Sequence, residues 1–297
     1  LGLAPSLSFL DAALFLFGFA SNTFNIALNA QAVDVECLYK RPIMSTFHGM
    51  WSLGGVAGGT LGAIVAPLGL PPLPHFIIMC AVTCLVTFSV RHRILPHDLP
   101  RKFTPKKHRG FTMPSCFILL LGFIAFSNMA TEGTMYDWSA VYFAQVVRPG
   151  EALVRAGYIA CMICMVCCRF IADRLVVRFG AIRVLQFGGL CTAAGFLLAC
   201  LVPTLPAATA GFAMVGFGMA PAIPLCYSLT SKSRTVSPSV AISIISTISF
   251  FGMLASPAGV GMLSHVFGLQ TALMPLAAMG LSIIVLAPLL TRAERNQ

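Results

Sequence analysis

Polar residues that could bind a ligand stand at helical spacing inside two otherwise apolar segments. Asn22, Asn25 and Asn29 follow one another at intervals of three and four residues, so on a helix they share one face, which Glu36 continues. Asn128 and Glu132 repeat the interval of four later in the chain. Amides can hydrogen-bond a small polar molecule, and a carboxyl group can in addition carry a proton. The spacing predicts polar helix faces directed at other helices or at a water-filled cavity.

Each of these groups also has a structural interpretation. Amides that bond between membrane helices contribute only about 0.6 kcal/mol per contact, and the three asparagines could serve that purpose alone. Glu132 lies 18 residues after Pro114, roughly 27 Å along a helix. A carboxylate inside a membrane is costly and points to a function, whereas at the outer interface it would be a solvated acid without one. Ser243 and Ser246 give a later segment a polar face that could line a cavity.

The composition limits the class of protein that could carry these residues. Of 297 residues, 58% are apolar and only 9% are charged, against roughly 25% charged in an ordinary soluble domain. A bilayer needs about 20 apolar residues per helix, and the chain holds several uncharged runs longer than that, such as 238–291. We therefore expect an all-α polytopic membrane protein, which argues against a soluble enzyme or a nucleic-acid binder.

No pattern in the sequence calls for a cofactor. It contains no phosphate-binding loop, no Ser/His/Asp order and no spaced metal-binding quartet. Cys161, Cys164 and Cys168 share one helix face, but ligands from a single helix cannot close a tetrahedral site, so core packing is the better interpretation. We expect no enzyme activity, no cofactor and no metal, and a soft-metal carrier is the weakest alternative.

Charges and Pro/Gly clusters divide the apolar sequence into nine predicted membrane spans. Pro221 and Pro224 are expected to break or bend the seventh span. Gly54, Gly58 and Gly62 are expected to let the second span approach its neighbours closely. The predicted spans are 8–33, 47–68, 74–91, 112–134, 152–172, 184–202, 206–229, 239–262 and 269–290.

The basic residues orient these spans. With nine spans, 17 of the 19 Lys and Arg residues fall on one side of the membrane, and only Arg148 and Arg155 fall on the other. Cytoplasmic loops carry the excess of Lys and Arg, so we expect the basic side and the C-terminus to be cytoplasmic. The net charge of +10 then records topology and not a nucleic-acid partner.

A faint internal repeat predicts the domain plan. A shift of 198 residues aligns Gly18-Phe19 with Gly216-Phe217 and the segment 54–67 with 252–265. Spans one to three thus match spans seven to nine, while spans four to six lack an upstream counterpart. We expect a protein of two six-helix bundles from which the first three helices are absent. The predicted domains are 1–93 (the second half of the N-terminal bundle), 94–111 (a basic cytoplasmic linker) and 112–297 (a complete C-terminal bundle with its tail).

One motif and this plan resemble a known family. Asp173-Arg174, followed by Arg178 and Gly180, is similar to the loop signature of the major facilitator superfamily between its helices 8 and 9. Cys168 and Arg169 depart from it where a small Gly is expected. The stretches 25–32, 41–49 and 132–139 look like the bacterial branch related to fucose permease, where a carboxylate often stands at the position of Asn25.

The resemblance implies a secondary transporter in the inner (plasma) membrane that moves a small-molecule substrate by alternating access. Asn22, Asn25, Asn29, Asn128, Glu132, Ser243 and Ser246 are its expected cavity residues. The expected cytoplasmic gate comprises Arg169, Asp173, Arg174 and Arg178, with the Asp173 carboxylate pairing with arginines or capping a helix N-terminus.

Coupling and the rival functions stay open in the sequence. Because asparagine cannot carry a proton, Glu132 is the candidate for proton coupling. The alternative to a transporter is a non-transporting membrane sensor or a truncated remnant. Besides the substrate and protons, the bilayer is the only partner that the sequence indicates.

Overall fold

The computed structural model describes residues 5–69, 71–95 and 114–297. The predicted linker 94–111 lies outside the described residues, apart from 94 and 95. The remainder is helical, as predicted. The α-helices are α1 (Leu7–Tyr39), α2 (Met44–Val65), α3 (Pro72–Val90), α4 (Cys116–Tyr142), α5 (Ala156–Phe179), α6 (Ala181–Leu201), α7 (Leu205–Met219), α8 (Ala222–Ser228), α9 (Pro238–Phe267), α10 (Leu269–Ala272) and α11 (Met274–Arg295).

These helices account for the nine predicted spans. Two spans are each divided into two helices, α7 with α8 and α10 with α11. The first break falls at Pro221 between α7 and α8, as predicted, because a proline removes a backbone donor and blocks helical pairing. Within the described part of the chain, seven helical stretches are long and apolar enough to cross a bilayer. The protein is an all-α polytopic membrane protein.

The segment that carries Asp173 differs from its prediction. The predicted span ends at residue 172 and leaves Asp173 in a loop, but α5 continues as a helix to Phe179. Positive charge is favourable in the last turn of a helix, where Arg178 stands. Gly180 then turns the chain at a φ of +84°, which other residues rarely adopt, and α6 begins at the next residue.

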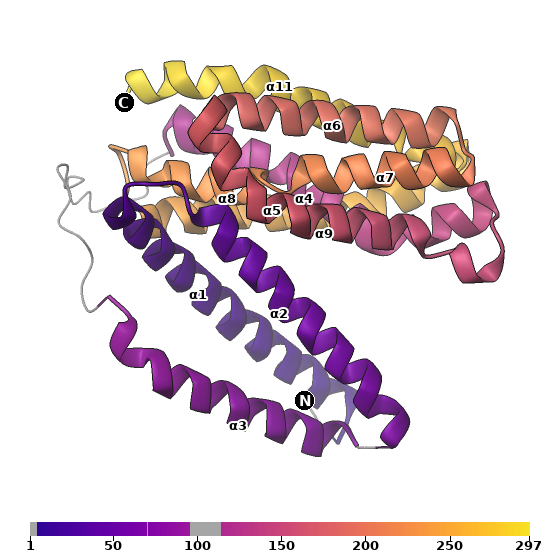
Figure 1. Ribbon diagram of the computed structural model, residues 1–297, viewed down its shortest axis with the longest axis horizontal. Coiled ribbons are helices and arrows are strands. Elements are labelled where there is room, and N and C mark those ends of the chain that lie inside the picture. Colours follow the sequence, from indigo (N-terminus) through magenta and orange to yellow (C-terminus); the bar gives the residue numbers. More distant parts are fainter. Residues whose placement is uncertain (1–4, 70, 96–113) are drawn as a thin grey trace.

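The helices from α4 to α11 pack into one bundle (Figure 1). The most extensive contacts join α4 to α9, α6 to α7 and α11, and α5 to α7. Glycines allow the backbones to approach closely. A Cβ added to Gly188 of α6 would lie 2.5 Å from the carbonyl oxygen of Gly218 on α7, and one added to Gly189 would lie 2.5 Å from that of Gly280 on α11. The bundle is therefore held by close backbone packing.

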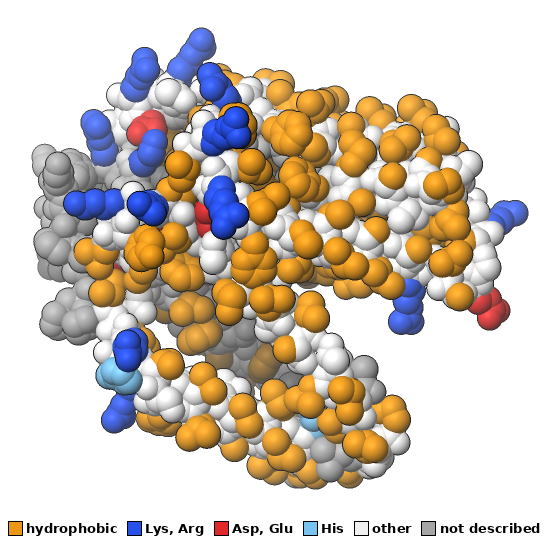
Figure 2. All heavy atoms as spheres, viewed as in Figure 1, with side chains coloured by type: hydrophobic (Ala, Val, Ile, Leu, Met, Phe, Trp, Pro, Cys, Tyr) orange, Lys and Arg blue, Asp and Glu red, His pale blue; other side chains and the backbone are white. Residues whose placement is uncertain are grey.

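The three N-terminal helices form a second lobe, which contacts the bundle at one end. There α2 packs on α5 and α8, and α1 packs on α8 and α9. Met44 and Ser52 of α2 are buried in this contact, and Ile26 and Ala30 of α1 pack against the bundle core. Away from this end the lobes diverge (Figure 1), and a cleft separates them (Figure 2).

The glycine run of α2 lies on the divergent part, and its prediction is wrong in this structure. A Cβ added to Gly54, Gly58 or Gly62 would have nothing within 4 Å. The spacing of small residues permits close approach but does not supply a partner, and here α2 has left the bundle before these residues. Only Gly49, one turn into the contact, meets a neighbour, with the Phe170 ring 3.0 Å from its added Cβ.

Candidate functional site

The two lobes meet where Asp173 of α5 caps the N-terminus of α2. Its carboxylate accepts hydrogen bonds from the backbone N–H of Ser45 at 3.1 Å and of Thr46 at 2.8 Å, and from the Thr46 hydroxyl at 2.6 Å. The first N–H groups of a helix have no partner within the helix, and its dipole favours a negative charge there. The sequence predicts that Asp173 either pairs with arginines or caps a helix N-terminus, and in the structure it caps a helix N-terminus.

A second carboxylate completes this cap from the other lobe. Glu36, near the end of α1, accepts hydrogen bonds from the N–H groups of Ile43 and Met44, both at 2.8 Å. Its other oxygen accepts a hydrogen bond from the Ser228 hydroxyl at the end of α8. The four N–H groups of residues 43–46 are thus bound by two carboxylates, one from each lobe. We call Glu36, Asp173 and these four N–H groups the carboxylate latch.

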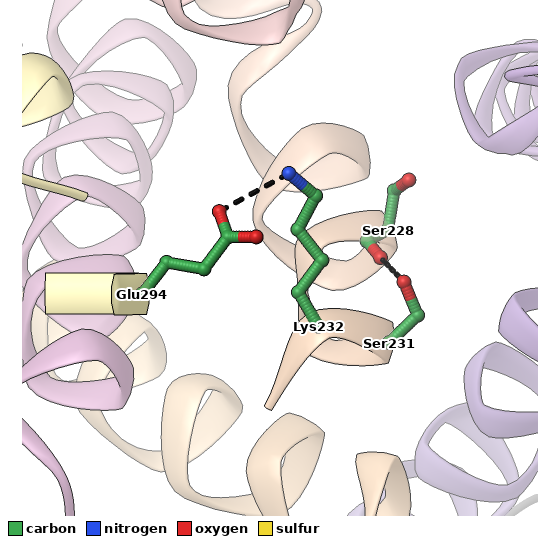
Figure 3. A network of polar contacts seen from close by, with 4 residues as sticks. All are labelled: Ser228, Ser231, Lys232 and Glu294. Carbon is green, nitrogen blue, oxygen red and sulfur yellow. Dashed lines mark hydrogen bonds and ion pairs between the residues drawn. The ribbon is translucent and has the colours of Figure 1, made fainter. Parts of the chain in front are cut away.

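The serine that binds Glu36 is fixed within the bundle (Figure 3). The Ser231 hydroxyl donates to the carbonyl oxygen of Ser228 at 2.8 Å. Lys232 then forms an ion pair with Glu294 of α11 at 3.1 Å, which ties the short helix η5 (Leu229–Lys232) to the end of the bundle. Glu36 therefore binds a group whose position the C-terminal bundle determines.

Arg169 lies one helical turn from Asp173, on the side toward the cleft. Its side chain is 3% exposed, and its Nη1 donates to the Ser52 hydroxyl of α2. The same hydroxyl donates to the carbonyl oxygen of His48 at 2.9 Å, and the His48 ring stands 6.0 Å from that of Tyr227 on α8. Both Arg169 Nε and His48 Nε2 are buried without a hydrogen-bond partner. The contact between the lobes is therefore polar and incompletely satisfied.

The predicted gate residues separate into two pairs. Asp173 and Arg169 both bond to α2, whereas Arg174 and Arg178 are exposed. Arg178 lies over the ring of Phe179, 5.3 Å from its centroid. Among the described residues, neither of the two exposed arginines bonds to the Asp173 carboxylate. Only one pair of the predicted gate thus reaches the other lobe.

The asparagine face of α1 continues the side of the helix that carries Glu36. Glu36 follows Asn29, Asn25 and Asn22 by seven, eleven and fourteen residues. Around the helix axis, each asparagine therefore lies within about 40° of Glu36. They lie roughly 10, 16 and 21 Å along the helix from Glu36. Asn22 is exposed, and Asn25 and Asn29 are half-buried. The Asn29 amide donates to Asn25, at 2.9 Å to its carbonyl oxygen, and also to its side-chain oxygen.

On the bundle, α4 presents the buried pair Asn128 and Glu132. Glu132 is 5% exposed and accepts a hydrogen bond from the Tyr136 hydroxyl at 2.8 Å. The alternative of a solvated acid at the membrane interface is therefore wrong. Asn128 is 2% exposed, and neither atom of its amide has a partner. Such a group is costly in a membrane protein unless water or a ligand binds it.

The two serines of α9 differ in their surroundings. Ser246 is buried and shares a hydrogen bond of 2.8 Å with the Tyr227 hydroxyl. Ser243 is half-buried, and its carbonyl oxygen accepts the Thr247 hydroxyl at 2.9 Å. Ser246 therefore connects α9 to the His48 and Tyr227 contact, while the Ser243 hydroxyl stays available at the surface of the helix.

Sequence reasoning does not predict the partners of the latch. Local capping patterns place the acceptor at the start of the helix itself, but Glu36 comes from the preceding helix and Asp173 lies 128 residues after Ser45. The available signal is the order of Glu36, Arg41-Pro42 and a new helix, which indicates a helix start near an acid. It does not identify Ser52, His48 or Ser228 as members of the site.

A polytopic helical protein whose two lobes meet at one end of a cleft has the architecture of a membrane carrier. This chain belongs to the major facilitator superfamily, since the model of that family, Major Facilitator Superfamily, matches residues 1–236. An uncharacterized transporter of Sinorhizobium fredii, y4wD, is 34% identical over 98% of this chain and 76% of its own length. The protein is a membrane transporter of this family and not an enzyme.

Other relatives agree with this assignment. An uncharacterized MFS-type transporter of Yersinia pestis is 31% identical over 94% of this chain and 72% of its own length. Membrane protein MosC of Rhizobium meliloti is 25% identical over 99% and 71%. The structure of the human organic anion transporter MFSD10 (TETRAN) superposes with a TM-score of 0.73 at 18% identity, covering 96% of this chain and 72% of that one. At that identity the likeness shows a common fold.

Proposed function

We propose that this transporter moves a small molecule by alternating access and that the carboxylate latch closes one end of its cleft. The observation that carries the proposal is the asymmetry of α2. Its first N–H groups are bound by carboxylates from both lobes, while Gly54, Gly58 and Gly62 face open space. A contact made of a few charge-assisted hydrogen bonds at one end can break and re-form, as alternating access requires.

The proposed orientation places the latch at the cytoplasmic side of the inner membrane. Lys and Arg side chains gather at the end of the molecule where the lobes meet (Figure 2). Arg148 and Arg155 lie on the opposite side of the bundle, in the connection between α4 and α5. Since basic loops face the cytoplasm, the described conformation would have its cleft open to the outside and closed within.

We propose that the substrate binds between the asparagine face of α1 and the polar residues of α4 and α9. Asn22 and Asn25 on one lobe and Asn128 and Ser243 on the other can all donate and accept hydrogen bonds. The unpartnered amide of Asn128 supports this assignment, because a ligand that offers both a donor and an acceptor would remove the cost of its burial.

Glu132 is the proposed proton carrier. Its carboxyl group is buried and accepts a hydrogen bond from the Tyr136 hydroxyl, and within the described residues no ion pair joins it to a basic side chain. A carboxyl group at this depth is the one side chain of the proposed cavity that can carry a proton across.

Transport by the protein in proteoliposomes tests both parts of this function. We would supply a mixture of small polar metabolites, impose a pH gradient, and identify what the vesicles accumulate by mass spectrometry. At matched amounts of protein, Asp173→Asn should slow accumulation about tenfold, equivalent to roughly 1.4 kcal/mol, and Glu132→Gln should abolish its dependence on pH. Exposed Asp137 on the same helix as Glu132 provides the control, Asp137→Asn, which should match the wild type.

The two variants contradict different claims. An unchanged rate in Asp173→Asn would remove the latch from the transport cycle. An identical pH profile in Glu132→Gln would show that protons, if they are coupled at all, do not pass through this carboxyl. No uptake of any metabolite above empty vesicles would contradict transport by this chain.

A further inference from the structure

Arg169 and Asp173 stand at positions i and i+4 of α5, and both side chains are buried, at 3% and 7% exposed. Opposite charges at this spacing normally attract each other along a helix. Here they do not bond to each other, since no ion pair joins Arg169 to Asp173 in the described part of the chain. All three bonds of Asp173 go to the start of α2, and the Arg169 bond goes to Ser52, also on α2.

The guanidinium is poorly satisfied in this arrangement. Its Nε has no partner, and the acceptor it does have, the Ser52 hydroxyl, is neutral. A buried charge is strongly destabilising unless it is paired or fully hydrogen-bonded. Arg169 therefore contributes little to the stability of the latched conformation. This arrangement indicates that another conformation gives the guanidinium a better hydrogen-bond acceptor.

We propose that Arg169 is a positioning residue that takes Asp173 as its partner when the latch opens. In the latched conformation Asp173 caps α2 and Arg169 bonds to Ser52. When α2 moves away from α5, both side chains lose their partners in the same step, and they pair with each other across one helical turn. The inference rests on the proposed function, because the exchange of partners requires that the latch opens.

This exchange of partners lowers the free energy that is needed to open the latch. Without Arg169, an Asp173 carboxylate that leaves the N–H groups of Ser45 and Thr46 would remain in a cleft with poor solvation and without a counter-charge. With Arg169 on the same helix, the new pair forms by side-chain rotation alone. Arg174 and Arg178 are exposed on α5, so they do not share the buried face on which Asp173 lies.

Hydrogen exchange of the backbone amides of Ser45 and Thr46 measures opening directly, because Asp173 of the other lobe accepts the hydrogen bonds of both N–H groups. The test starts from Ser52→Ala, which removes the bond of Arg169 in the latched conformation. In that background, Arg169→Gln should slow exchange of these amides about two- to fivefold, since it removes a pair that exists in the open conformation alone. Asp173→Ala in the same background should speed exchange.

Controls separate this effect from a general loss of structure. Arg174→Gln removes an exposed arginine next to Asp173 and should leave exchange unchanged. Arg169→Met, which keeps the length of the side chain, should act as Arg169→Gln does and replaces it if that variant fails to elute as a single species. An arginine with a purely structural role predicts faster exchange in both Arg169 variants, and that result, or no change, would overturn the proposal.

The outcome distinguishes this inference from the function on which it rests. If Asp173→Ala does not speed exchange, the latch itself is wrong. If Asp173→Ala speeds exchange while the Arg169 variants do not slow it, the latch stands and the partner exchange is wrong.

Discussion

The C-terminal bundle and the N-terminal lobe use the same small residues in different ways. In the bundle, Gly188 and Gly195 lie against the backbones of Gly218 and Gly211 on α7. In α2, the glycine run from 54 to 62 has no neighbour within reach of an added Cβ. Small residues therefore allow contact but do not determine it. Contact depends on a facing helix, which the bundle supplies and the lobe lacks along most of its length.

The hydrogen bonds between helices also differ between the bundle and the contact of the two lobes. Within the bundle, the fully buried Tyr142 hydroxyl donates to the carbonyl oxygen of Ala199 at 2.7 Å, and Trp138 Nε1 donates to that of Pro257 at 3.0 Å. These bonds sit in closely packed surroundings that resist motion. Between the lobes, Asp173 accepts hydrogen bonds from N–H groups of α2, and Glu36 accepts one from the Ser228 hydroxyl. Contacts within the bundle are therefore closely packed, whereas the contact between the lobes is polar and confined to one end.

The largest expected effect comes from filling space in the bundle. Gly188→Ala places a Cβ 2.5 Å from the Gly218 carbonyl oxygen, so α6 and α7 must separate, at a cost of about 2–3 kcal/mol. The control, Gly58→Ala, adds the same group to α2 where nothing lies within 4 Å. Thermal unfolding of the purified variants should show a clear loss of stability for Gly188→Ala and none for Gly58→Ala. Equal losses would mean that the glycine run of α2 is packed after all.

A smaller effect should follow from removing one buried hydroxyl. Tyr142→Phe leaves the Ala199 carbonyl oxygen without its donor in a fully buried position, which should cost about 1 kcal/mol of stability. Tyr39→Phe at the end of α1 removes the same group from a ring that is 64% exposed and should change nothing measurable. If both variants lose the same stability, the difference in packing between the bundle and the N-terminal lobe does not affect the free energy of unfolding.

The smallest effect belongs to the ion pair at the end of the bundle. Lys232 and Glu294 are 50% and 34% exposed, so water and salt screen their attraction, and Lys232→Ala should cost less than about 0.5 kcal/mol. Salt should abolish even this difference. A loss above 1 kcal/mol would show that η5 is held by this pair and that the position of Ser228 depends on it.

Much of the fold follows from the sequence, because hydrophobic run length is a strong signal in membranes. The helical segments of the nine predicted spans and the break at Pro221 are confirmed, and seven helical stretches of the described chain are long and apolar enough to cross a bilayer. The prediction that Asp173 and its neighbouring arginines lie in a loop is wrong, since they form the last turns of α5. Charged residues can end an apolar run without ending the helix. The length of the apolar run alone therefore does not show where the helix ends.

The site is less predictable because its bonds join residues far apart in the chain. The spacing of Asn22, Asn25 and Asn29 predicts a shared face, and in the structure the Asn29 amide donates to the side-chain oxygen of Asn25. The role of Glu36 is not visible in its neighbours, since its partner Ser228 lies 192 residues away. Whether the predicted cavity residues bind substrate stays a prediction that transport experiments decide.

Hydrogen exchange at the start of α2 tests the central claim most directly. In the wild-type background, the amides of Ser45 and Thr46 should exchange at least about tenfold faster in Asp173→Ala, which corresponds to roughly 1.4 kcal/mol of latch stability. The amides of Ile43 and Met44 should likewise exchange faster in Glu36→Ala. Amides within the bundle should exchange as in the wild type. Unchanged exchange at residues 43–46 in both variants would contradict the account, because the two carboxylates would then not hold the lobes together.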